Sequence, residues 1–130
     1  MKLQENNITG RYEHTYTAYI YVGLKDKNNN NIASIDEVKK ICQDYVDNIG
    51  LCVTVTPTEF IYTNGNEPGV IVGLINYPRF PKKGFEIIKL ANELGKKLMV
   101  QLEQCRISIV YPQSTIIFFN NDKIDSLENK

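Results

Sequence analysis

The feature that most constrains the fold is one run, residues 51–77, with the sequence LCVTVTPTEFIYTNGNEPGVIVGLINY. Two stretches rich in β-branched and aromatic residues flank the turn-forming segment NGNEPG, a pattern that predicts a long β-hairpin. Pro57 lies within the first stretch and cannot donate a backbone hydrogen bond, so we expect that strand at a sheet edge or bulged there. The second stretch, residues 70–77, is nearly continuously apolar and is typical of a central strand.

The hairpin lies between two predicted helices. Ser34 and Glu37 form a capping-box pattern, after which apolar residues recur with helical spacing until Gly50 supplies a left-handed stop. A second helix ends near Gln104, and Gly95 within it costs about 1 kcal/mol relative to alanine. The buried stripe of this second helix is predicted at five positions: Ile87, Ala91, Leu94, Leu98 and Leu102.

Three further strands complete the pattern. Residues 15–24 alternate between an aliphatic face and a face that carries Tyr19 and Tyr21. Residues 106–111 and 115–119 are separated by a tight turn at Pro112. The order β-α-β-β-α-β, with a short extra C-terminal strand, predicts an α+β, ferredoxin-like sandwich with two helices on one face of an antiparallel sheet.

The length is typical of one domain, so we expect a single domain over residues 1–130. The polar ends, residues 1–13 and 120–130, are expected to be flexible. The sheet face opposite the helices would be left apolar and aromatic by Tyr19, Tyr21 and alternate hairpin residues. Because such a face is usually covered by association, we expect a homo-oligomer, a dimer or a trimer.

A family resemblance is carried by residues of the central run. They are Cys52, Val53, Pro57, the Ile61-Tyr62 pair, Gly65 and the aliphatic residues 70–75. This part of the chain resembles the middle of the CutA proteins, trimeric ferredoxin-like relatives of the PII signalling proteins. The resemblance implies a trimer in which long hairpins pack between subunits and ligands lie at the subunit boundary. The first strand and the C-terminal segment depart from the family's patterns, and no binding residue carries over position by position.

Composition excludes several classes of function. Fifteen Lys and Arg balance 15 Asp and Glu, so general nucleic-acid binding is not expected. No apolar run has the length of a signal peptide or a membrane span, so we expect a cytoplasmic protein with no membrane partner. Three scattered cysteines and one histidine favour neither a disulfide framework nor a zinc site. The asparagine-rich loops and the preference for lysine indicate an AT-rich genome, bacterial or phage.

The best candidate for a ligand site is the loop NYPRFPKKG before the second helix. Arg79 lies there between two prolines, and Lys82 and Lys83 follow just ahead of the helix N-terminus. Free backbone amides and the helix dipole favour an anion at such a place. Tyr77 or Phe80 could stack on a nucleobase. The alternative is a solvated, proline-stiffened loop whose arginine makes a structural ion pair.

Other polar residues are weaker candidates. Glu59 follows a threonine-rich stretch near Pro57; exposed decoration of a strand explains that stretch, but in a cleft Glu59 would accept hydrogen bonds from a ribose or an amine. His14 is expected at the surface, because sequence spacing brings no nucleophile or carboxylate partner to it. The three cysteines are expected as small core residues: Cys42, Cys52 and Cys105.

Two function hypotheses remain. The first is a non-enzymatic, oligomeric binding protein, a sensor or a sequestering protein, that captures a small anionic metabolite or nucleotide at intersubunit clefts without a cofactor. The alternative is a protein-interaction module, for example a phage-encoded or accessory inhibitor or adaptor that acts through the exposed sheet face. Because no paired carboxylates, triad or metal cluster can be assembled from the sequence, no catalytic or metal-binding residue is assigned, and an enzyme is less favoured.

Overall fold

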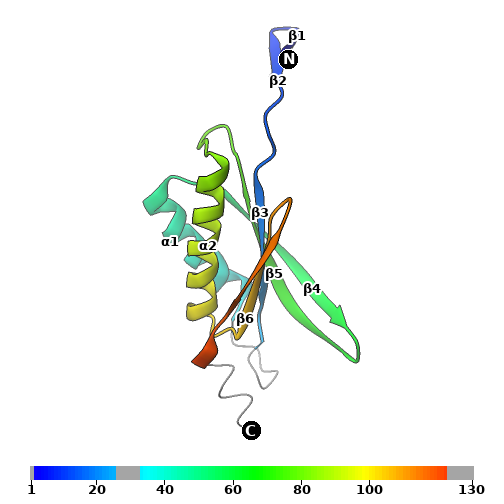
Figure 1. Cartoon of the computed structure of the whole chain (residues 1–130), viewed down its shortest axis with the longest axis vertical. Helices are drawn as coiled ribbons and strands as arrows, with labels where there is room; N and C mark the ends of the chain where they lie inside the picture. The colour runs from blue at the N-terminus through cyan, green and yellow to red at the C-terminus, as the bar shows by residue number, and fades with distance from the viewer. Residues whose placement is uncertain (1, 26–32, 123–130) are drawn as a thin grey trace.

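The computed structural model describes residues 2–25 and 33–122, and its main sheet has five antiparallel strands in the order β4-β5-β3-β6-β7. The strands are β3 (Thr17–Gly23), β4 (Val53–Tyr62), β5 (Gly65–Ile75), β6 (Arg106–Val110) and β7 (Thr115–Phe119). Two helices, α1 (Ile35–Ile49) and α2 (Gly84–Gln101), pack side by side on one face of this sheet (Figure 1). The chain is therefore α+β, and β3, the first strand of the sheet in sequence, lies at its centre.

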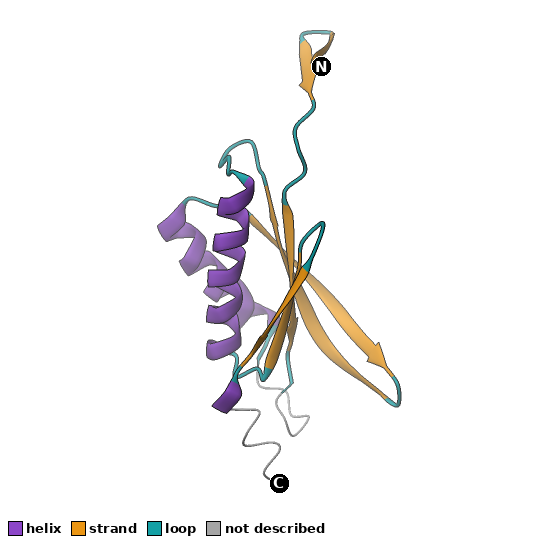
Figure 2. Ribbon diagram, viewed as in Figure 1, coloured by secondary structure: helices purple, strands orange, loops and turns teal. Residues whose placement is uncertain are grey.

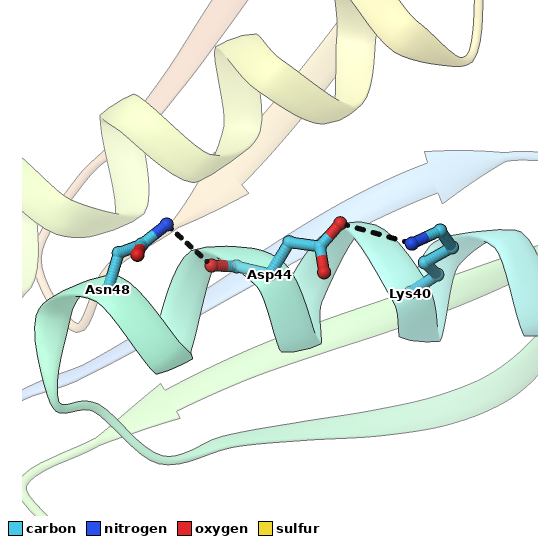
Figure 3. Close-up of polar contacts among 3 residues, drawn as sticks. All are labelled: Lys40, Asp44 and Asn48. Atoms are coloured by element: carbon cyan, nitrogen blue, oxygen red, sulfur yellow. Dashed lines mark hydrogen bonds and ion pairs between the residues drawn. The ribbon is translucent and has the colours of Figure 1, made fainter.

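Helix α1 begins and ends where the sequence predicts. The Ser34 hydroxyl accepts a hydrogen bond from the Glu37 amide at 3.3 Å, which satisfies one free amide of the first turn. Gly50 has φ of 77°, and its amide donates to the Val46 carbonyl at 2.9 Å. The exposed side of α1 carries a Lys40–Asp44 ion pair of 3.4 Å, next to a 3.0 Å hydrogen bond from the Asn48 side chain to the Asp44 carbonyl (Figure 3). Local sequence signals thus determine where this helix begins and ends.

Helix α2 supplies most of the helical contribution to the core. All five predicted stripe positions are buried, although the helix ends at Gln101, three residues before Gln104. An ideal Cβ on Gly95 would lie 2.7 Å from Ile109 Cδ1. The glycine therefore allows α2 to lie closer to β6 than any larger residue would. Gly95 thus lowers the helix propensity of α2, but it permits this close packing.

The predicted hairpin is confirmed and lies at the sheet edge. β4 and β5 pair in continuous register, from Val53 opposite Leu74 to Tyr62 opposite Gly65, so the strand passes Pro57 without a bulge. The turn is shorter than the segment NGNEPG, because Asn64 adopts φ of 64° and reverses the chain within two residues. Most of that segment is consequently β5. The hairpin continues past the end of β3 and projects away from the helices (Figure 2).

The N-terminal residues form a second, separate hairpin. β1 (Lys2–Glu5) pairs with β2 (Ile8–Arg11) through a turn in which Asn6 and Asn7 have φ of 51° and 65°. It stands beyond the start of β3, apart from the body (Figure 1). These residues belong to the end expected to be flexible, and that expectation stays a prediction. At the other end, residues 123–130 lie outside the described residues.

The sheet face opposite the helices, here called the open face, has no element of this chain packed over it within the described residues (Figure 2). Tyr19 lies on it with 40% of its surface exposed, and Ile117 and Phe119 are 48% and 51% exposed. Tyr21 lies there half-buried. The predicted uncovered, aromatic face is thus confirmed for the single chain.

The remaining sequence expectations concern isolated residues. Cys42 is buried, whereas Cys52 and Cys105 are half-buried, and all three are free thiols. His14 is exposed, as predicted. None of the helices in the described part of the chain is both long and apolar enough to cross a membrane.

Candidate functional site

The loop that the sequence analysis proposes as a ligand site, residues 76–84, consists of two parts that make different contacts. In the first, the Phe80 amide donates to the Tyr77 carbonyl at 2.9 Å, which closes a turn over Pro78 and Arg79. The Arg79 guanidinium lies 5.6 Å from the centre of the Phe80 ring, within cation–π range. The structure therefore brings Tyr77, Arg79 and Phe80 together. Phe80 also lines a cavity of about 340 Å³ between α1 and β4, beside Cys42.

The two lysines of the loop lie in the second part. Lys82 Nζ donates to the Gly50 carbonyl at 2.7 Å, and the Lys82 amide donates to Asn76 Oδ1 at 2.8 Å. Lys82 therefore links the loop to the end of α1. The Lys83 amide donates to Glu86 Oε1 at 3.1 Å, so a carboxylate already occupies the helix N-terminus. A cleft of about 460 Å³ beside both lysines is also lined by Arg11, Glu13 and Glu86. Arg11 pairs with Glu13 at 2.7 Å, so Glu86 is the carboxylate of this lining that is left to offset the lysine charge.

Glu59 lies elsewhere. It is exposed on the outer strand β4, opposite Pro68 of β5, on the hairpin arm that extends beyond β3. In the register of β4 it shares a side with Val53 and Val55, which is the side of the sheet that the helices cover. The structure thus places Glu59 away from the Tyr77–Lys83 loop, and the six predicted residues do not form one site.

A different cluster forms where the hairpin leaves the sheet. In the registers of β3, β4 and β5, Gly23 is opposite Gly69, and Phe60 is opposite Glu67. The Phe60 ring covers Gly69, where any Cβ would collide with it. The Phe60 and Tyr21 rings are 6.3 Å apart and tilted by 54°. We name this group, with Gln104, the Glu67 cluster.

The central feature of the Glu67 cluster is a pair of acceptor oxygens. An ideal Cβ on Gly23 would lie 3.0 Å from Glu67 Oε2 and 3.0 Å from Gln104 Oε1, so both oxygens lie over this glycine. Gln104 is 8% exposed, and its Nε2 donates to the Lys25 and Leu102 carbonyls at 3.2 Å each. These two bonds direct the amide nitrogen away and leave Oε1 facing Glu67.

Neither oxygen has a donor. Within the part of the chain that the structure describes, Glu67 makes no ion pair or hydrogen bond, and none reaches Gln104 Oε1. No fully buried side-chain nitrogen or oxygen of that part is unsatisfied, so each of the two oxygens keeps some surface in contact with solvent. Two acceptor oxygens that both lie 3.0 Å from the same point, beside aromatic rings, suit a cation or an N–H donor.

Sequence reasoning missed this cluster. Glu67 was assigned to the hairpin turn, and Gln104 only marked a helix end. The available signal was Gly23 in a predicted strand, because glycine within a strand often marks a place where another group approaches closely. The meeting of three distant segments at Gly23 depends on the β3–β5 and β3–β6 pairings, which spacing does not reveal.

Two solved structures resemble this fold. One is a phage SAM lyase in complex with S-methyl-5'-thioadenosine, with a TM-score of 0.68 and 18% identity over 82% of this chain and 91% of that chain. The other is a phage SAM lyase in the apo state, with a TM-score of 0.72 and 17% identity over 86% and 95%. At these identities the likeness shows the fold. No protein-family model matches the sequence, and no curated protein has a significant match to it.

Proposed function

We propose that this chain binds S-adenosylmethionine (SAM) at the Glu67 cluster and cleaves it to S-methyl-5'-thioadenosine. The observation that carries the proposal is the pair of unpartnered acceptor oxygens, Glu67 Oε2 and Gln104 Oε1, over Gly23. The likeness to SAM lyase structures over most of their length supports the choice of ligand.

The charges of SAM match the cluster. Its sulfonium and ammonium groups are both cationic, and a carboxylate beside the rings of Phe60 and Tyr21 favours a cation. The ammonium can also donate hydrogen bonds to both acceptor oxygens. The alternative hypothesis, an anionic metabolite at Lys82 and Lys83, has weaker support because Glu86 caps that helix end and Lys82 holds the Gly50 carbonyl.

The proposed reaction breaks the bond between the sulfonium sulfur and the four-carbon amino-acid fragment. Sulfur keeps both bonding electrons and leaves as a neutral thioether. In one route, the carbon that loses the sulfur forms a bond to the carboxylate oxygen of the same ligand, which gives a lactone. In the other route, the neighbouring carbon loses a proton and a carbon–carbon double bond forms, which gives an alkene. Both routes balance without a second substrate. Glu67 binds and orients the cation in either case, and accepts the proton in the second.

Calorimetry of SAM binding tests the first step. We expect Glu67→Gln to weaken SAM binding at least tenfold, which corresponds to about 1.4 kcal/mol, because it removes the charge that faces the cation. Binding of S-methyl-5'-thioadenosine, which is neutral, should change much less. Glu59→Gln is the matched control on the same hairpin and should leave SAM binding unchanged. Equal SAM affinity of Glu67→Gln and the parent protein would contradict the proposal.

Chromatography with mass detection tests the second step. Incubation with SAM should yield S-methyl-5'-thioadenosine together with either the lactone or the alkene, and Glu67→Gln should slow its formation. Binding without any release of the thioether would reduce the proposal to a non-enzymatic SAM-binding protein, whereas the sequence-based hypothesis names an anionic metabolite or a nucleotide as the ligand.

We also propose that the domain is a ferredoxin-like sandwich that works as a homo-oligomer, with a second copy on the open face. The exposed Tyr19, Ile117 and Phe119 support this, because a monomer would leave their apolar surfaces in water. The Glu67 cluster borders this face, so a neighbouring copy would help to enclose the ligand. The trimer that the CutA resemblance implies stays a prediction. Light scattering that gives the monomer mass of 14.9 kDa would contradict the oligomer and leave the protein-interaction module as the use of this face.

A further inference from the structure

Another cavity lies at the end of β3 opposite the Glu67 cluster. We name it the Tyr16 pocket; it has a volume of about 270 Å³ and is lined by residues 15–17, by residues of the first turns of α2 and by residues 111–114. β3 runs from Thr17, at this pocket, to Gly23, at the Glu67 cluster. The rise of a strand puts about 20 Å between these two ends. One small ligand therefore cannot fill both places within one chain.

The walls of the Tyr16 pocket are fixed by local contacts. The Tyr111 hydroxyl donates to Asn92 Oδ1 at 2.6 Å and lies 3.2 Å from the Ile88 carbonyl, which ties this ring to α2. On the other side, an ideal Cβ on Gly84 would lie 2.5 Å from the Tyr16 ring. The ring therefore rests on the bare backbone at the start of α2. The pocket is preformed between two aromatic walls.

The lining determines the charge of a ligand. No Asp, Glu, Lys, Arg or His lines the Tyr16 pocket. Burial raises the pKa of Tyr111, so this phenol stays neutral over the ordinary pH range. The Ser114 hydroxyl at the pocket makes no hydrogen bond with another described residue, so it is available to a ligand. An uncharged ligand with hydrogen-bonding atoms at its edge fits these conditions, whereas an ion would lose its hydration without gaining a partner.

We propose that the Tyr16 pocket is a second small-molecule site, which binds a neutral, planar heteroaromatic ring such as a free nucleobase. The ring would lie against Tyr16 and Tyr111, and its edge would meet the Ser114 hydroxyl. The volume is just below the range of about 300–1,000 Å³ of drug-sized pockets, so it holds a ring and not a dinucleotide. This site is separate from the proposed SAM site and does not depend on it.

Protein-observed NMR titration tests this site with adenine as the probe. We expect saturable shifts of the Gly84, Ile88 and Ser114 amides, with at least tenfold weaker binding of adenosine monophosphate, whose phosphate brings two negative charges. Shifts confined to the amides of Phe60, Glu67 and Gly69 would place adenine at the other site and overturn the proposal. The absence of saturable shifts, or equal binding of the monophosphate, would also overturn it.

Two variants on α2 sharpen the test. Ile88→Ala removes part of the pocket wall and should weaken adenine binding at least fivefold. Val100→Ala trims an aliphatic residue that is exposed on the same helix and should leave binding unchanged. Equal effects of the two substitutions would overturn the site. Shifts of the pocket amides that follow protein concentration in the absence of adenine would overturn it too, because they would show that a second copy fills the pocket.

Discussion

The two faces of the sheet differ although they alternate along the same strands. In β3, Ile20 and Val22 are fully buried under the helices, whereas Tyr19, between Ala18 and Ile20, is 40% exposed on the open face. The covered face is aliphatic and supplies the core. The open face carries aromatic rings, threonines and the Glu67 cluster. One strand therefore supplies the core with one set of side chains and presents the other set on the open face, where the proposed ligand site lies.

The glycines separate the faces further. Gly23, Gly69 and Gly73 all lie on the open face, and the side chains of Glu67, Phe60 and Thr54 occupy the space where their Cβ atoms would be. The same strands carry no glycine on the covered face. These three side chains of the open face thus lie over the backbone of a neighbouring strand, whereas side chains of the covered face pack into the core under the helices.

The largest effect should come from a large-to-small change on the covered side. Leu98 is fully buried, and Leu98→Ala should lower the free energy of unfolding by about 3 kcal/mol. Ile117→Ala on the open face should cost less than about 0.5 kcal/mol at low protein concentration, because its side chain is largely solvated in the single chain. Urea denaturation measures both. Similar losses of unfolding free energy in the two variants would contradict the difference in burial between the two faces.

The second prediction concerns the pH dependence of stability, which we attribute to the buried thiol of Cys42 in α1. Burial raises the pKa of Cys42 from 9.0 to about 11. A folded-state pKa above the unfolded value stabilises the fold below pH 9, and this contribution is lost as the pH rises from 9 to 11, by up to about 1.4 kcal/mol per pH unit. Urea denaturation at several pH values should show a shallower decline for Cys42→Ala. Val38→Ala, also buried in α1, should lower stability at every pH without changing the slope.

The smallest of these effects tests the contact between α2 and β6. Propensity alone predicts that Gly95→Ala gains about 1 kcal/mol. The contact with Ile109 predicts a net loss of about 1 kcal/mol, because the new methyl group must displace Ile109 Cδ1. Ile109→Val removes that atom, so Gly95→Ala in this background should be neutral or stabilising. A stabilising Gly95→Ala in the parent chain would show that the helix can move away from the sheet at little cost.

Much of the fold follows from local signals, and the site does not. The Ser34 hydroxyl caps the start of α1, and the left-handed Gly50 ends it, each within one turn of the chain. Asn64 sets the hairpin turn through its own positive φ. Each helix then links two strands that run in the same direction with one antiparallel strand between them, and the rules for such crossover connections leave few possible strand orders. The Glu67 cluster depends instead on which residues of distant strands meet at Gly23 and on where one glutamine amide points. These are consequences of register and of side-chain packing, and no short sequence pattern encodes them.

The position of Pro57 has a consequence for the behaviour of the protein at high concentration. β4 is an outer strand, and a proline is accommodated in its continuous register because its nitrogen needs no partner on the solvent side. The outer edge of β4 therefore lacks one backbone N–H donor near the middle of the strand. A strand from another molecule could not add there without leaving a carbonyl unsatisfied, which discourages growth of the sheet into amyloid-like aggregates.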